Sequence, residues 1–376
     1  MKTGAFATGI YPNYLAEAGI SEDEALEKVK KAFDIIFFDP EENFCHHADE
    51  DAWCMVDTGN NDARTEGMSY GMMMCVQMDR KDIFDKLWTF AERYMLIHKG
   101  PSSGYFRWSV KTDGQPNSNG PAPDGEEYFA MALFMAGARW GNSTGSFDYD
   151  TRAREILRHA VHQHEMIKGG QPMWEPENGY IRFVPEMKIS DPSYHLPHFY
   201  ELFALKADEE DRTFWKYAAE QSRKYIALSA DPETGLSPEY ADYEGKTVLL
   251  FGKPWVYYSD AYRVAENIAL DHVWFGEDPR LSQIATHIQD FFAGQDLENL
   301  KAYELKGQPQ SEPAMHPTAI RAILGAASIA SDSEKRGKFL KEFAEMPMRR
   351  GVRRYYDNCL YFFCLLMLTG NYRIYL

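Results

Sequence analysis

Two kinds of helical segment alternate along the chain, and this alternation constrains the fold more than any other feature. In the first kind, apolar residues recur at intervals of three and four, as at Leu26, Val29, Phe33 and Ile36, while charged residues fill the positions between them. That pattern is typical of a helix with one face on a core and one in water. The segments of this kind are residues 22–38, 80–97, 148–165, 208–229, 278–294 and 331–346.

Segments of the second kind are apolar on nearly all sides and alternate with the first. They are residues 68–78, 126–140, 193–207, 260–275, 316–330 and 355–370. Each is too short to cross a membrane, so we expect burial inside a large core. Inner and outer helices in strict alternation predict an all-α fold, an (α/α)6 barrel with six inner and six outer helices. An open α-solenoid is the alternative, but the segments share no repeated consensus.

We expect one barrel domain over residues 1–376, because no linker, charge block or low-complexity tract divides the chain.

The formal net charge of -17, without a Lys/Arg cluster, argues against nucleic acid or an anionic membrane as a partner. Five cysteines form no CxxC pair, and no signal-like or membrane-spanning segment is evident. These features predict a cytoplasmic protein. The oligomeric state stays open, with a monomer as the simplest case.

A polar loop precedes each inner segment. These loops are rich in Gly, Pro or aromatic residues and end in polar or charged ones, and they span residues 57–67, 117–127, 184–193, 252–260, 307–316 and 349–357. If the inner helices run parallel to one another, all of these loops lie at one end of the barrel. We expect ligand-binding residues there.

Three carboxylates in these loops are candidates for catalysis: Glu66, Asp124 and Asp260. Each also has a structural explanation. Glu66 could complement a helix dipole, Asp124 could cap a helix with Glu127 as the reciprocal acid, and Asp260 could cap a helix or pair with Arg263.

Together, two of the carboxylates match the needs of acetal hydrolysis, which takes one acid to protonate the leaving oxygen and one base or nucleophile. The proton donor needs an apolar surround, and Glu66 stands before Tyr70 and the run Met72–Met74. The base needs a nearby cation, which Arg263 supplies to Asp260. The helix dipole opposes a protonated Glu66, so burial has to outweigh it.

The segment "RTEGMSYGMMM" resembles the signature of glycoside hydrolase family 8. Similarity extends through "GPAPDGEEYFAMALF", "SDPSYHLPHFYELF", "SDAYRVAENI", "MHP" and "RRYYDNCLYFF". The segments are most similar to exo-acting members that release xylose from the reducing end of β-1,4-xylo-oligosaccharides. The resemblance implies an (α/α)6 barrel and inversion at the anomeric carbon, with Glu66 as general acid, Asp260 as general base and Asp124 as a third carboxylate that binds and distorts the sugar at subsite -1.

An inverting mechanism carries a geometric expectation. The two working carboxyl groups should lie roughly 6.5 to 9.5 Å apart, against about 5 to 5.5 Å in retaining enzymes, because a water has to fit between base and sugar.

The resemblance also implies roles for residues outside the carboxylates. His316 contacts the reducing-end xylose in a loop that closes the cleft; Trp108 and Tyr194 bind the sugar at subsite -1; Arg263 and Tyr356 orient the base and its water. The structural alternatives are a helix start for "HP", core packing for the aromatic residues and a surface ion pair for Arg263.

We expect neither a metal nor a cofactor, and a xylo-oligosaccharide as the ligand. Three histidines lie on the charged segment 148–165, and the pair in "SYHLPHF" lacks an acid partner for a metal triad. An endo-acting xylanase, endoglucanase or chitosanase of the same family is the alternative. A non-catalytic sugar-binding α/α toroid is a more remote one.

Overall fold

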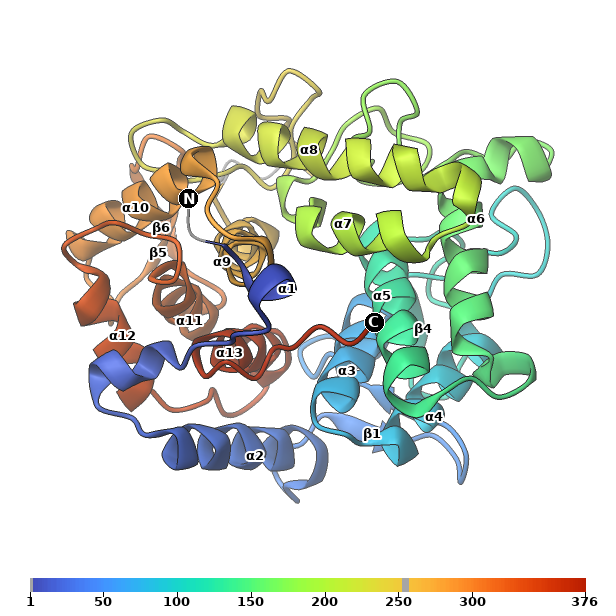
Figure 1. The fold of residues 1–376 in the computed structure, drawn as a ribbon, viewed down its shortest axis with the longest axis horizontal. Coiled ribbons are helices and arrows are strands. Elements are labelled where there is room, and N and C mark those ends of the chain that lie inside the picture. Colours follow the sequence, from blue (N-terminus) through green and yellow to red (C-terminus); the bar gives the residue numbers. More distant parts are fainter. Residues whose placement is uncertain (1–2, 252–256) are drawn as a thin grey trace.

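The structure, a computed structural model, describes residues 3–251 and 257–376. Every predicted inner segment contains a helix. These helices are α3 (Thr65–Gln77), α5 (Pro123–Trp140), α7 (Pro197–Lys206), α9 (Arg263–Phe275), α11 (Pro317–Ala327) and α13 (Arg354–Leu368). Each contacts the next in this order, and α13 contacts α3, so the inner ring is closed (Figure 1).

Every predicted outer segment is helical as well. The outer helices are α2 (Glu22–Phe38), α4 (Lys81–Phe90), α6 (Tyr149–Met166), α8 (Arg212–Ser229), α10 (Pro279–Ala293) and α12 (Arg336–Glu345). Helix α2 packs on α13, and each of the others packs on the inner helix before it in the chain. The outer ring therefore surrounds the inner one, and the predicted (α/α)6 barrel is confirmed.

The inner helices owe their position to their sequence. Met72, Met73, Met74 and Cys75 of α3 are completely buried, as expected for a helix with packing partners on all sides. The five cysteines are buried and free. No helix among the described residues is both long and apolar enough to span a bilayer.

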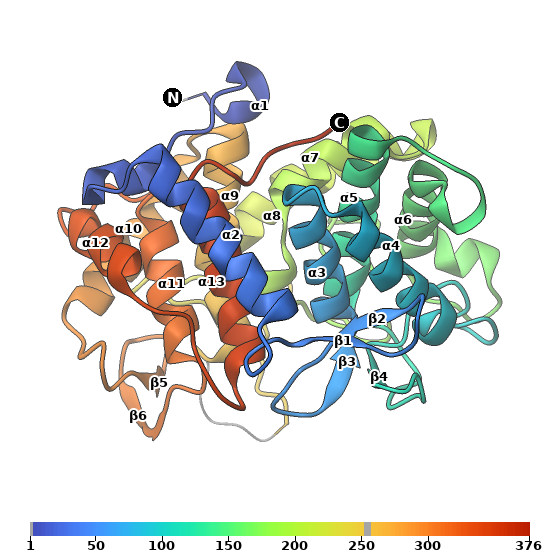
Figure 2. The ribbon, with the colours of Figure 1, turned by 90° about the horizontal axis from the view of Figure 1, so that it is seen from below.

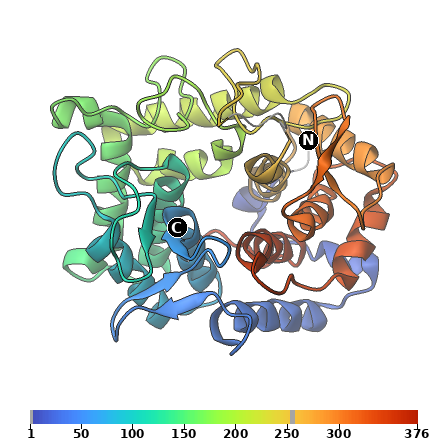
Figure 3. The ribbon, with the colours of Figure 1, turned by 180° about the vertical axis from the view of Figure 1, so that it is seen from behind.

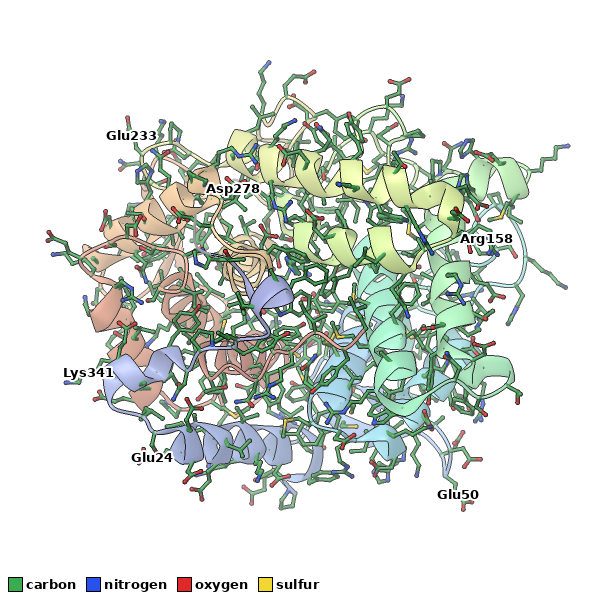
Figure 4. The ribbon with its side chains drawn as sticks, viewed as in Figure 1. Glu24, Glu50, Arg158, Glu233, Asp278 and Lys341 are labelled. Atoms are coloured by element: carbon green, nitrogen blue, oxygen red, sulfur yellow. The ribbon has the colours of Figure 1, made fainter. Side chains whose placement is uncertain are left out.

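Each outer helix has one face exposed to solvent. Glu24 of α2 and Lys341 of α12 lie at the outer edge of the barrel in Figure 4. The prediction for α2 was wrong at one position: Leu26 is 41% exposed, and the remaining members of its predicted apolar face are buried. Helix α2 begins in a capping box made by its Ser21 N-cap.

The short strands and the chain termini lie at opposite ends of the barrel. Three antiparallel pairs form: β1 (Cys45–His47) with β2 (Trp53–Met55), β3 (Asp62–Arg64) with β4 (Ser109–Lys111), and β5 (Lys301–Tyr303) with β6 (Pro309–Pro313). Figure 2 shows these strands at one end, with α1 (Ala5–Thr8) and the C-terminus at the other. Because β3 runs into α3 and β6 lies just before α11, the strand end is where these inner helices begin. Figure 3 looks onto that end.

Candidate active site

Arg263, the first residue of α9, contacts all three predicted carboxylates through its guanidinium. Its Nη1 donates to Asp124 Oδ2 at 3.0 Å, to Glu66 Oε2 at 3.2 Å and to Tyr70 Oη at 3.1 Å. Its Nη2 lies 3.3 Å from Asp260 Oδ1. Glu66 and Asp124 lie in the first turns of α3 and α5, Asp260 lies in the turn before α9, and one buried guanidinium contacts all three.

The structure contradicts the capping explanation for Asp124, confirms the predicted pairing of Asp260 with Arg263, and places Glu66 in the first turn of α3, where it can complement the helix dipole. Helix α5 takes Ala122 as its N-cap, and Asp124 lies inside it, accepting a hydrogen bond from Gly125 N at 2.9 Å. Its supposed reciprocal acid, Glu127, accepts from Tyr200 instead. Asp260 lies in the 3₁₀ turn Ser259–Tyr262, where its carboxylate faces Arg263.

Glu66 has the environment of a proton donor. Burial raises its pKa to about 7 against the attraction of Arg263, and the like charges of Asp124 and Asp260 add to the rise. Tyr355 Oη donates to Glu66 Oε1 at 2.8 Å and fixes the side chain. Burial therefore outweighs the helix dipole, and this acid holds its proton close to neutral pH.

Asp260 has the environment of a base. Its side chain is 25% exposed, against 14% for Glu66 and 8% for Asp124, so it is the carboxylate most open to water. The Arg263 side chain is only 5% exposed, which makes a surface ion pair the wrong explanation for it. Glu66 and Asp260 bind different terminal nitrogens of this guanidinium, which therefore lies between them.

Two cavities meet at these carboxylates, and both are lined by Arg64, Glu66 and Asp260. The wide cavity has a volume of about 540 Å³. Its other lining residues are Thr65, Trp108, Pro121, Ala122, Asp124, Phe183, Val184, Met187, Tyr194, Tyr240, Phe251 and Arg263. The narrow cavity has a volume of about 110 Å³. Its other lining residues are Asp57, Asn60, Ser259, Met315, His316, Arg353, Tyr355 and Tyr356.

The predicted sugar-binding aromatic residues line the wide cavity. Trp108 is 39% exposed, with the Arg64 guanidinium 5.5 Å from its ring centre, so it is no core residue. Tyr194 is buried in the cavity wall, with the Arg263 guanidinium 5.4 Å from its ring centre. Part of the predicted polar loop 252–260, including Trp255, falls outside the described residues.

His316 and Tyr356 line the narrow cavity together. Their ring centres lie 4.7 Å apart. Tyr356 Oη donates to the carbonyl of Ser259 at 2.9 Å, which places it against the backbone before Asp260 and not on the carboxylate itself. Pro317 is the first residue of α11, so the "HP" pair starts a helix and also places its histidine in the cleft.

Sequence reasoning missed three residues of this site. Tyr355 holds Glu66, and Arg64 pairs with Asp57 and Asp62 at the entrance to α3. Asp191 is completely buried, and burial followed by the charge of Asp260 raises its pKa well above the usual range.

Signals for two of them were present in the sequence. Tyr355 adjoins Tyr356, and Asp191 opens "DPS", a helix-start pattern in which its side chain accepts from Ser193 N at 2.7 Å. No group of three or more His, Cys, Asp or Glu residues within the described ranges is arranged to hold a metal ion.

Comparison with known proteins identifies the family. The sequence profile of "Glycosyl hydrolases family 8" matches residues 46–370. The chain belongs to this family of glycoside-cleaving enzymes.

Close relatives cover essentially the whole chain. The reducing-end xylose-releasing exo-oligoxylanase Rex8A of Paenibacillus barcinonensis is 50% identical over 99% of this chain and 98% of its own. The reducing end xylose-releasing exo-oligoxylanase of Halalkalibacterium halodurans is 49% identical over 99% of this chain and 96% of its own. A solved structure of a Rex8A mutant complexed with 3(3)-alpha-L-arabinofuranosyl-xylotetraose has a TM-score of 0.97 at 49% identity, covering 100% of this chain and 99% of that one.

Proposed function

We propose that this protein is an inverting glycoside hydrolase that releases xylose from the reducing end of β-1,4-xylo-oligosaccharides. The observation that carries the proposal is the asymmetry of the cleft about Glu66 and Asp260. One side offers about 540 Å³ and the other about 110 Å³. A cleft with room for several sugars before the cleaved bond and for about one after it favours removal of a single terminal sugar. The names of the two close relatives support the same substrate and direction of attack.

The proposed chemistry assigns one proton transfer to each working carboxylate. Glu66 gives its proton to the glycosidic oxygen as the bond from that oxygen to the anomeric carbon breaks. Asp260 takes a proton from a water whose oxygen bonds to the same carbon from the opposite face. This is inversion with general acid and general base catalysis. Each cycle leaves Glu66 without a proton and Asp260 with one, and exchange with solvent restores both.

Arg263 and Asp124 transfer no proton in the proposed reaction. Arg263 stabilises the ionised base, and Asp124 binds the sugar. Arg263 keeps Asp260 in ionic contact at 3.3 Å, which favours the ionised base. Asp124 faces the wide cavity beside Tyr194 and Trp108. We assign these three to the sugar on the non-reducing side of the cleaved bond, where hydrogen bonds and stacking supply binding energy that distorts the ring.

On the other side of the bond, the narrow cavity takes the leaving xylose. His316 and Tyr356 form its wall with Met315 and Arg353. In this proposal the wall blocks a longer chain from continuing past the leaving sugar, and an endo-acting enzyme would need that path open. The asymmetry therefore favours exo action over an endo-acting xylanase, endoglucanase or chitosanase.

Xylotriose and its reduced form, xylotriitol, test the proposal. We expect xylotriose to give xylose and xylobiose, and xylotriitol to stay intact, because the narrow cavity should reject an open-chain alditol. Time-resolved chromatography of the products measures both. Rapid cleavage of xylotriitol, or an early loss of xylan viscosity before xylose appears, would favour the endo-acting alternative.

A further inference from the structure

The backbone on either side of Tyr194 is held by a buried amide from another helix. Asn267 Nδ2 donates to the carbonyl of Ser193 at 2.8 Å and to the carbonyl of His195 at 3.4 Å. These two residues directly precede and follow Tyr194, so one side chain holds the backbone at both ends of the tyrosine. Asn267 lies inside the barrel, where it is only 4% exposed.

An amide at this position of α9 needs an explanation, because the helix is apolar on nearly all sides. Val264, Ala265, Ile268 and Ala269 are buried around it. Burying an amide costs free energy unless its polar atoms are hydrogen-bonded, and a leucine would fill a similar space without that cost. The carbonyls that Asn267 bonds belong to the segment before α7 and not to its own helix. Its contribution therefore lies in placing that segment.

The same helix also contacts the ring of Tyr194. Arg263 lies about one turn before Asn267 on α9, and its guanidinium is 5.4 Å from the centre of the tyrosine ring. The turn Ser259–Tyr262, which carries Asp260, runs directly into α9. One continuous element therefore carries the base, the cation that holds the base and the amide that holds Tyr194.

The hydroxyl of Tyr194 is available to a ligand. None of the described residues hydrogen-bonds it, and the side chain lines the wide cavity. Burial and then the charges of Asp124, Asp191 and Asp260 raise the pKa of Tyr194 well above its usual range, so the hydroxyl keeps its hydrogen. It is a hydrogen-bond donor beside the reacting carboxylates. Hydrogen bonds weaken steeply as their angle departs from linear, so the direction of this hydroxyl matters.

We propose that Asn267 is a positioning residue for the reaction: by holding the backbone on both sides of Tyr194, it aims the tyrosine hydroxyl at the sugar beside Asp260. Asn267 lines neither cavity, so it acts through the tyrosine. Tyr200 supports the same segment from α7, with its hydroxyl 3.1 Å from the carbonyl oxygen of Tyr194. The inference rests on the proposed function, in which Tyr194 binds the sugar on the non-reducing side of the cleaved bond.

A double-mutant cycle with xylotriose as substrate tests this inference. In Asn267→Leu both carbonyls lose their donor with little change in volume. We expect kcat/KM to fall roughly 10- to 100-fold, because a displacement of about 1 Å in an active site can cost about 10²-fold in rate. In the Tyr194→Phe background there is no hydroxyl to misplace, so the same replacement should cost about 3-fold or less. A defect unrelated to the tyrosine would lower kcat/KM by the same factor in both backgrounds.

Gln289→Leu is the matched control. Gln289 is a completely buried amide of α10, and its Nε2 donates to the carbonyl of Leu324 at 2.8 Å and to Ser328 Oγ at 2.7 Å. None of these residues lines either cavity. The replacement should destabilise the fold as Asn267→Leu does, yet leave kcat/KM unchanged in both backgrounds. An equal loss of activity in this control would assign the effect of Asn267→Leu to stability and overturn the inference.

Asn267→Ala covers the case in which Asn267→Leu does not fold. It leaves room for a water to bond the two carbonyls, and an exchangeable water should hold the tyrosine less firmly, so we expect the same pattern of losses. If the unaltered enzyme does not cleave xylotriose, the proposed function fails. If it does, and replacing Asn267 costs nothing or costs equally with and without the Tyr194 hydroxyl, the function stands and this inference is overturned.

Discussion

Glu66 is the residue on which the proposed chemistry depends most. Replacing it with Gln keeps its shape but removes the transferable proton, so turnover of xylotriose should fall by about 10² to 10⁴. Steady-state kinetics measures the loss. Glu92→Gln is a matched control, because Glu92 is equally exposed at 14% and is also paired with an arginine, Arg152, but lies on the outer wall. Equal activity of the Glu66 variant and the parent would return the non-catalytic toroid to consideration.

The raised pKa of Glu66 predicts the alkaline limb of the pH profile. Burial brings this pKa to about 7, so the acid loses its proton, and kcat/KM should fall, as the pH rises through about 7. In Glu66→Gln the residual activity should lack this limb. An alkaline limb that persists unchanged in the variant would assign the titration to another group.

The raised pKa of Glu66 also makes the stability of the folded protein depend on pH. The folded-state pKa of Glu66 lies above the ordinary value of 4.5, so its favourable contribution is fully present below pH 4.5 and is lost as the pH rises through about 7. Glu66→Gln should therefore melt higher than the parent at pH 8, and this advantage should disappear by pH 4. Thermal unfolding followed by circular dichroism measures the difference. A variant less stable than the parent at pH 8 would contradict the direction of the shift.

Arg263 holds carboxylates that would otherwise repel one another. Arg263→Met leaves them buried without their cation, and breaking a buried pair in this way costs about 3–5 kcal/mol of unfolding free energy. Denaturant unfolding checks the loss. The exposed pair of Arg158 with Asp208 supplies the comparison: Arg158→Met should cost about 1 kcal/mol or less. A loss as small in the Arg263 variant would mean that the guanidinium does not bridge the acids.

At the scale of elements, the close approach of α3 and α13 positions the proton donor. Gly67 follows Glu66, and a Cβ added there would lie 2.4 Å from Tyr355 Oη, the group that holds Glu66. Gly67→Ala should displace this tyrosine, lower activity roughly 10-fold or more and cost about 1–3 kcal/mol through overpacking.

Gly337 of α12 provides the opposite case. A Cβ there meets nothing within 4 Å, so Gly337→Ala should leave activity unchanged and raise stability by about 0.4–1 kcal/mol. Thermal melts and kinetics on both glycine variants make the comparison. A Gly67→Ala enzyme with full activity would show that the tyrosine contact is dispensable.

The sequence predicted the helices well and the short elements poorly, for a physical reason. A helix of four or five turns repeats its apolar period often enough to be recognised, as in α2 and α8. Strands of three residues such as β1 and β3 are too short to show any period, and their pairing depends on contacts across the end of the barrel.

The site was predictable where residue type and local spacing carry the information. Asp260 and Arg263 stand one turn apart, and their contact follows from that spacing. The contacts of Arg263 with Glu66 and Asp124 depend on ring closure, which no local pattern encodes. Tyr355 was missed for the same reason, because it reaches Glu66 from the last helix of the barrel.

At the scale of the whole molecule, we propose that residues 1–376 form a single catalytic domain. The buried side chains from α2 to α13 belong to one contact cluster, and the inner ring closes between α13 and α3. Unfolding should then be a single cooperative transition, with far-UV and near-UV circular dichroism changing together. Two separated transitions would indicate separate folding units.

The central claim is that Glu66 and Asp260 act on opposite faces of a bond one sugar from the reducing end. Proton NMR of xylotriose during the first turnovers tests it most directly, since it identifies the products and the anomer of the newly formed end before mutarotation. We expect xylose together with xylobiose whose new reducing end is the α-anomer. A β-anomer at that end, formed by retention, would contradict the proposed roles of the two carboxylates.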